Sequence, residues 1–169
     1  MTINSPGAWT LSGSGAAAAL TGTLTNSGTI TLLNGASLTT TTGALNNTGA
    51  VSVDGQQTFG TGGSSLVLGG ALTNGAGASF EIGNISLTAT SAAQAASLSN
   101  AGTVNLEGNG AAAHAALTLA GGLTNTATFL VDAQVGAVGG STVTVGGTLD
   151  NSGGTLTVGN SRGLAHRRR

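Results

Sequence analysis

The chain has no cysteine and a single proline, and only 5% of its 169 residues are charged and 2% aromatic. Without cysteine it can form no disulfide and perform no thiol chemistry, so the redox state of its compartment stays open. No apolar run approaches the roughly 18 residues that a membrane helix needs. Residues 1–9 lack the basic and apolar regions of a signal peptide. We therefore expect no membrane insertion, while the route of any export stays open.

Basic residues are absent from the body of the chain. There is no lysine, and all the basic residues lie near the C-terminus: Arg162, Arg167, Arg168 and Arg169. The five acids all precede them, so the body carries a formal charge of −5 and the tail +4, which gives the net −1. Such a run is usually a solvated tail, but these arginines are also a candidate assembly contact with the acidic body of a neighbouring copy. No aromatic platform or basic face accompanies the tail, so we expect no nucleic-acid partner.

A Leu-x-Asn unit returns six times along the chain. Its leucines lie 21, 27, 26, 25 and 26 residues apart, and a period in this range is typical of a solenoid. With 31 glycines and so few charges the composition alone would suggest disorder, but the period overrides that suggestion. We expect the asparagines to stack at one corner and to bond backbone groups left open by the turn. The members of this structural ladder are Asn26, Asn47, Asn74, Asn100, Asn125 and Asn151.

An alternating pair of apolar residues follows each unit, and period-two alternation indicates a strand with one buried face. The first members of the pairs form the expected core ladder, which consists of Ile30, Val51, Phe80, Val104, Phe129 and Leu156. Gly, Asn and Asp clusters such as Asn34-Gly35 end most of these strands and predict turns. Further pairs, such as Leu117/Leu119, precede the next unit. The pattern predicts an all-β protein, a parallel β-helix of about six coils and roughly 30 Å in length.

The chain therefore divides into three parts. Residues 1–20 follow the repeat poorly and are expected to form a partial N-terminal coil or cap. Residues 21–160 carry the β-helix repeats, and residues 161–169 form the basic C-terminal tail. The apolar faces of single coils are too small to fold alone, so stacking must close one continuous core.

The Leu-x-Asn-x-Gly-Thr units resemble the repeat region of filamentous-haemagglutinin-type adhesins and related autotransporter passengers of bacteria. Repeats of the Gly-x-Leu-x-Asn-x-Gly-x-Ile type are typical of those families. The matching segments are residues 22–30, 43–51, 70–74, 98–104, 121–125 and 147–153. The resemblance implies a right-handed β-helix that is secreted or exposed on the bacterial cell surface. It also implies a role in adhesion or as a stalk, often within a much larger polypeptide.

Residues that could carry chemistry are few, and we expect no catalytic residue, no metal site and no cofactor. Asp54, Glu107 and Asp132 occupy the same place after their strands, and we interpret them as turn and rim residues. Glu107 and Asp132 lie in consecutive coils, so they are also candidates for a weak cation site or an acid/base pair about one strand spacing apart. His114 has no partner at a metal-ligand spacing.

These patterns favour a non-enzymatic structural protein of an adhesin or fibre, acting as a rod, a stalk or a self-assembling filament subunit. We expect end-to-end self-association, with a host or surface glycan or protein as a candidate partner. The alternative is a glycan-binding or glycan-active β-helix protein that uses loop and rim residues such as Glu107 and Asp132. An ice-binding surface is less favoured, because it needs regular threonine pairs such as Thr29/Thr31 and residues such as Glu81 break that array.

Overall fold

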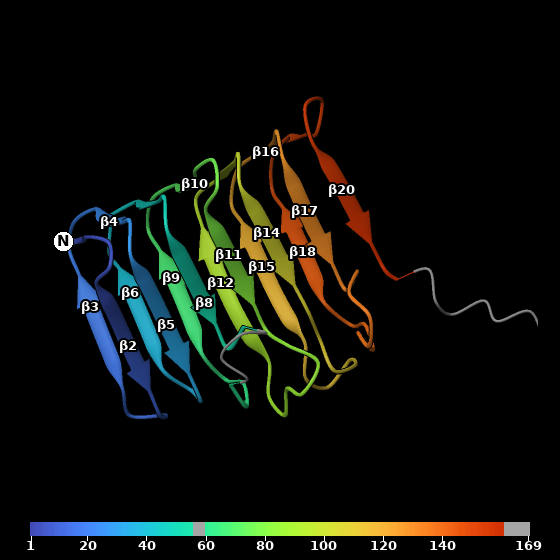
Figure 1. The fold of residues 1–169 in the computed structure, drawn as a ribbon, viewed down its shortest axis with the longest axis horizontal. Coiled ribbons are helices and arrows are strands. Elements are labelled where there is room, and N and C mark those ends of the chain that lie inside the picture. Colours follow the sequence, from blue (N-terminus) through green and yellow to red (C-terminus); the bar gives the residue numbers. More distant parts are fainter. Residues whose placement is uncertain (56–59, 161–169) are drawn as a thin grey trace, which may run out of the picture.

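The computed structural model describes residues 1–55 and 60–160, and all the regular elements in these residues are β-strands. The strands pair in parallel and form three sheets, which we call sheets A, B and C. Figure 1 shows the strands side by side from the N-terminal end, in blue, to β20, in red. The predicted all-β parallel solenoid of about six coils is confirmed. Within residues 1–55 and 60–160 no helix exists that is long and apolar enough to cross a membrane.

Each sheet takes one strand from each coil. Sheet A holds the short strands β1 (Thr2–Ile3), β4 (Leu24–Asn26), β7 (Leu45–Asn47), β10 (Leu72–Asn74), β13 (Leu98–Asn100), β16 (Leu123–Asn125) and β19 (Leu149–Asp150). Sheet B holds β2 (Ala8–Ser12), β5 (Thr29–Leu33), β8 (Ala50–Val53), β11 (Ser79–Ile82), β14 (Thr103–Leu106), β17 (Thr128–Val131) and β20 (Thr155–Val158). Sheet C holds β3 (Ala17–Leu20), β6 (Ser37–Thr40), β9 (Ser65–Leu68), β12 (Ser91–Ala95), β15 (Ala115–Leu119) and β18 (Thr142–Val145).

The chain visits the sheets in the order A, B, C, so three successive strands make one coil. Six coils are complete in the described residues, and β19 and β20 add two strands of a seventh. Residues 1–20, for which the sequence predicted a partial coil or cap, contain one strand of every sheet. β1 and β2 pair in register with the next coil, with Ile3 beside Asn26 and Trp9 beside Ile30.

The register places equivalent residues of the repeat beside one another. In sheet A each repeat leucine pairs with the leucine of the next coil, from Leu24 to Leu149. In sheet B the core ladder of the sequence is one continuous column from Ile30 to Leu156. Because parallel in-register pairing puts like side chains one strand spacing apart, one repeat pattern builds a continuous core.

The core lies between the three sheets and is almost wholly aliphatic. Phe80 and Phe129 are fully buried in the sheet B column, where they fill more volume than the neighbouring Val104. Leu156, the last member of this column, is 37% exposed, because the described chain places no further coil over it. The interior thus stays closed along its length and opens at the C-terminal end.

Replacing Val104 with aspartate tests this inward assignment. Val104 is completely buried, so the new carboxylate would have no partner, and we expect the variant to lose more than about 3 kcal/mol of stability. Circular dichroism with urea unfolding measures the loss. Thr103→Asp, at an exposed position of the same strand, is the matched control and should change little. A Val104→Asp protein as stable as this control would contradict the assignment.

Candidate functional site

The six asparagines of the Leu-x-Asn unit form a hydrogen-bonded ladder at the corner between sheets A and B. The side-chain Nδ2 of each asparagine donates to the Oδ1 of the next: Asn26 to Asn47 at 2.8 Å, Asn47 to Asn74 at 2.8 Å, Asn74 to Asn100 at 2.8 Å, Asn100 to Asn125 at 2.7 Å and Asn125 to Asn151 at 2.6 Å. The first five side chains are at most 1% exposed. All the bonds run in one direction, toward the C-terminal end.

The first five asparagines also bond to the backbone of the next coil, at the first residue of its strand in sheet B. Nδ2 of Asn100 donates to the backbone carbonyl of Thr128 in the next coil at 3.0 Å and to that of Gly102 in its own coil at 3.3 Å. The backbone N–H of Gly102 returns a bond to Oδ1 of Asn100 at 3.2 Å. One side chain therefore satisfies backbone groups of two coils at a corner where the sheet ladder is interrupted, which is what the turn chemistry of asparagine allows.

Glycine follows two residues after several of these asparagines for a steric reason. A Cβ at Gly28 would lie 2.0 Å from the carbonyl oxygen of Gly7, and one at Gly49 would lie 2.1 Å from that of Gly28. Atoms cannot approach so closely, so a side chain is excluded at these two positions. The fourth and sixth coils have Ala78 and Ala127 at the same place in the register, for which the structure offers no reason.

A second column, made of acidic residues and glycines, directly follows the strands of sheet B. Each member donates its backbone N–H to a carbonyl of the preceding coil, at the second inward-facing residue of that coil's strand in sheet B. The N–H of Gly83, for example, bonds to the carbonyl of Val53. The members are Asp54, Gly83, Glu107, Asp132 and Gly159. The φ angles of Asp54, Gly83, Asp132 and Gly159 are positive, between 50° and 79°, which is the left-handed region that Gly, Asn and Asp adopt most readily. Glu107 is not among the residues with a positive φ. The predicted turn places of Asp54 and Asp132 are thus explained by backbone conformation.

Asp54 and Asp132 use their carboxylates to close the loops that they begin. Oδ2 of Asp54 accepts from the backbone N–H of Ser64 at 3.0 Å and from Oγ of Ser91 at 2.8 Å, and Oδ1 accepts from the N–H of Asn34 at 2.8 Å. Asp132 accepts from the N–H and Oγ of Ser141 at 2.9 and 2.7 Å, and from the N–H of Gly108 at 2.9 Å. Both carboxylates are nearly inaccessible to solvent, so the donors replace the water that a charge requires.

The sequence does contain a signal for the hydrogen bonds that Asp54 and Asp132 accept, and sequence reasoning missed it. A serine stands 10 residues after Asp54 and another 9 residues after Asp132, in each case shortly before a strand of sheet C. The rim interpretation of the two aspartates underestimated their burial, because loop residues that pack over the corner are not encoded in the strand pattern.

Glu107 differs from its two neighbours in the column. Its side chain is fully buried, yet it accepts one long hydrogen bond, from Nδ2 of Asn105 to Oε1 at 3.4 Å. Oε2 of Glu107 and Oδ1 of Asn105 are both buried without a hydrogen-bond partner among the described residues. The pKa of Glu107 is raised from 4.5 to about 7: burial is the largest cause, the Asn105 hydrogen bond opposes it, and the charges of Asp132 and Glu81 add to the rise.

The candidate pair of Glu107 and Asp132 therefore lies in consecutive coils, as the spacing predicted, but neither carboxylate is open to solvent. The oxygens of Asp132 already accept from three donors. Over the described ranges, no group of three or more His, Cys, Asp or Glu side chains is arranged to hold a metal ion. The His114 ring lies 3.0 Å from the carbonyl oxygen of Ala111 and 3.4 Å from Oγ1 of Thr90.

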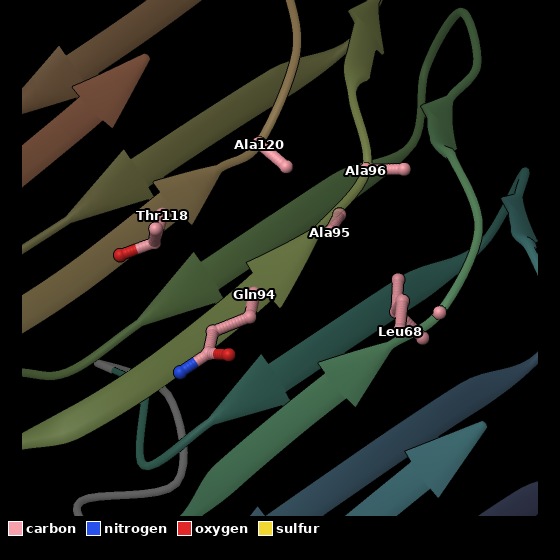
Figure 2. A pocket seen from close by; sticks show the side chains of 7 residues that line it. Leu68, Gln94, Ala95, Ala96, Thr118 and Ala120 are labelled. Carbon is pink, nitrogen blue, oxygen red and sulfur yellow. The ribbon is translucent and has the colours of Figure 1, made fainter. Parts of the chain in front are cut away.

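The outer surface carries a shallow depression of about 230 Å³ at the ends of β9, β12 and β15. Its lining residues are Leu68, Gly69, Gln94, Ala95, Ala96, Thr118 and Ala120. Figure 2 shows the side chains of Gln94 and Thr118 on adjacent strands, where the two residues are paired. One carboxamide and one hydroxyl are its polar side chains, so the depression offers hydrogen bonds without charge.

The C-terminal end of the solenoid is hollow and apolar. A cavity of about 210 Å³ is lined by Leu123, Phe129, Val131, Val143, Val145, Leu149, Leu156 and Val158. Leu149 and Val158 are 49% and 73% exposed. The candidate assembly residues Arg162, Arg167, Arg168 and Arg169 lie outside the described residues.

Comparisons with protein-family models, with curated proteins and with solved structures found no match to this chain. Any proposal about function therefore rests on three features of the structure: the asparagine ladder, the second column after the strands of sheet B, and the open C-terminal end.

Replacing Asn100 with alanine should break the ladder in its middle. The change leaves Nδ2 of Asn74 without its acceptor and Oδ1 of Asn125 without its donor, so we expect a loss of about 3 kcal/mol in the free energy of unfolding. Urea unfolding followed by circular dichroism measures it. Asn46→Ala is the control, because Asn46 is exposed beside the ladder residue Asn47. Equal stability of the two variants would show that the ladder contributes nothing.

Replacing Asp132 with asparagine should destabilise the protein by about 2 kcal/mol. The N–H groups of Gly108 and Ser141 bond to different oxygens of Asp132, so an amide puts its NH₂ group against one of the two and removes the charge that strengthens both bonds. Thermal or urea unfolding provides the measurement. The exposed Asp150→Asn serves as the control and should leave the unfolding midpoint in place. A stable Asp132→Asn protein would mean that the loop is held by other contacts.

Proposed function

We propose that this chain is a structural, non-enzymatic segment of a secreted or surface-exposed bacterial adhesin or fibre, which acts as a rod or stalk and associates end to end. The observation that carries the proposal is the continuity of the asparagine ladder and of the core column from coil to coil. The resemblance of the repeats to adhesin passengers supports the surface location.

Continuity suits a rod because every coil is bound to its neighbours by the same contacts. Backbone pairing, stacked aliphatic side chains and amide bonds recur at each step along the axis. The stability of such an array is approximately the sum of nearest-neighbour terms, so coils can be added without redesign. A protein that must present something at a distance benefits from this kind of extension.

The two ends favour association between copies. At the C-terminal end, Leu149, Leu156 and Val158 surround an apolar hollow, and the outer edges of β18, β19 and β20 have no neighbouring strand among the described residues. At the other end β1, β2 and β3 present edges of the same parallel type. Exposed edges and apolar surface are the usual template for pairing with another chain. The opposite charges of the body and the arginine tail add an attraction that salt should weaken.

Negative-stain electron microscopy and size-exclusion chromatography at low and high salt test this proposal. We expect particles that lengthen along one axis as the concentration rises, with shorter particles at high salt. Removing residues 162–169 should reduce the effect of salt. Val158→Lys should shorten the particles, because it places a charge on the apolar end, whereas Thr103→Lys on the side of the rod should not. Monomers under all conditions would overturn end-to-end association.

A further inference from the structure

The side chains of Glu107 and Asn105 form an incomplete hydrogen-bonded pair on the outward side of sheet B. Asn105 lies in β14 and Glu107 directly follows that strand, and the contact between Nδ2 of Asn105 and Oε1 of Glu107 places both side chains on the same side. Nδ2 of Asn105 donates to Oε1 of Glu107, which leaves two buried oxygens, Oδ1 of Asn105 and Oε2 of Glu107, without a donor in the described part of the chain. Two acceptors without donors at one place is a costly arrangement in a protein interior.

One hydrogen atom would complete this pair. A neutral carboxyl group has one O–H donor and one carbonyl acceptor, and a carboxamide has the matching N–H donor and carbonyl acceptor. Facing each other, they form two hydrogen bonds, from Nδ2 to Oε1 and from Oε2 to Oδ1. The first of these bonds is present, and the two unpartnered atoms are the ones that the second would join.

We propose that Glu107 and Asn105 are a proton-binding site, in which a neutral Glu107 closes an acid–amide pair and stabilises the corner between sheets B and C in the fifth coil. This inference is independent of the proposed role as a rod, because it concerns one corner of a single molecule.

The surrounding groups favour a proton over a metal ion. Glu81 on the neighbouring strand β11 and Asp132 after β17 bring negative charge toward Glu107. The Asp132 oxygens are already held by three donors, so they are poorly placed to coordinate a cation. His114 also lies near this corner. A Cβ atom added to Gly108, the residue after Glu107, would be 3.1 Å from Cα of His114. A hard divalent cation such as calcium takes about six or more oxygen ligands, more than this corner offers, whereas the proton joins only a pair of oxygens.

The effect on stability follows from the pKa of Glu107, which is about 7 in the folded chain against an ordinary value of 4.5. Below pH 4.5 both the folded and the unfolded chain carry the proton, and the contribution of the pair is complete. Between pH 4.5 and 7 the unfolded chain loses the proton first, so the unfolding equilibrium constant rises by up to about tenfold per pH unit. Above pH 7 the folded chain is also ionised and the stabilisation is lost.

Isotopic labelling can observe the proton directly, because the chain contains two glutamates, Glu81 and Glu107. Protein grown with glutamate labelled with ¹³C at the carboxyl carbon should give two carboxyl signals. The signal that is absent from a Glu107→Gln variant belongs to Glu107, and we expect it to titrate with a pKa of about 7. Titration at its ordinary value would overturn the proposal.

Two substitutions separate the acid–amide pair from burial alone. The glutamine of a Glu107→Gln variant reproduces both hydrogen bonds at every pH, whereas Glu107→Met removes the charge and leaves the Asn105 amide without a partner. We expect Glu107→Gln to lie close to the wild type at about pH 4.5 and to exceed it at about pH 8, with the unfolding constant on the order of 100-fold lower. Glu107→Met should be less stable than Glu107→Gln at both values.

The comparison with the glutamine variant also removes every pH-dependent contribution that the two proteins share. Urea unfolding of the full chain at both pH values provides the data. If Glu107→Met is as stable as Glu107→Gln, burial of the charge alone explains the behaviour and no acid–amide pair exists. If wild type and Glu107→Gln lose the same stability between the two pH values, Glu107 binds no proton in this range.

Discussion

In-register parallel stacking is the constraint on which the rest of this structure depends. Almost every strand residue has its equivalent in the coil before and the coil after, about one strand spacing away. Each position of the repeat is therefore a column of side chains that runs through successive coils. Only side chains that can pack against an identical side chain fit such a column. Aliphatic residues meet this condition by dispersion and burial, and asparagine meets it because an amide is both a donor and an acceptor. The repeat places aliphatic residues in the core and asparagine at one corner.

The low charge content follows from the same constraint. Like charges stacked at strand spacing repel, and burying them adds a desolvation penalty. Asp54 and Asp132 are accommodated because backbone and serine donors surround each carboxylate. Glu107 in the same column lacks such donors among the described residues, and its pKa rises accordingly. The 5% charged composition is thus the chemical consequence of an architecture in which most side chains face a copy of themselves.

The sequence was informative where a position repeats and uninformative where it does not. The spacing of the leucines predicted the solenoid, because six copies of one pattern have few other interpretations. For residues 1–20 the sequence predicted only a partial coil or cap, since Met1, Thr2 and Ile3 stand where the other coils have Leu-x-Asn. The burial of Glu107 could not be predicted either, because strand alternation assigns it to the outside. Loops that cover this corner vary from coil to coil, and no period describes them.

The direction of the asparagine ladder gives the two ends of the rod different chemistry. Each Nδ2 before the last points its bond toward the C-terminal end, so the first member, Asn26, keeps a buried Oδ1 that no group in the described ranges donates to, beside Ile3. At the last member, Asn151, Nδ2 turns back to the carbonyl of Gly154 in its own coil at 3.1 Å. The strands add a second polarity, because within each sheet all of them run in parallel. Two identical ends therefore cannot meet with their strands parallel, and an assembly that continues these sheets must be head to tail. Such a contact is heterologous and does not close on itself when it follows a straight axis, so its natural product is a filament.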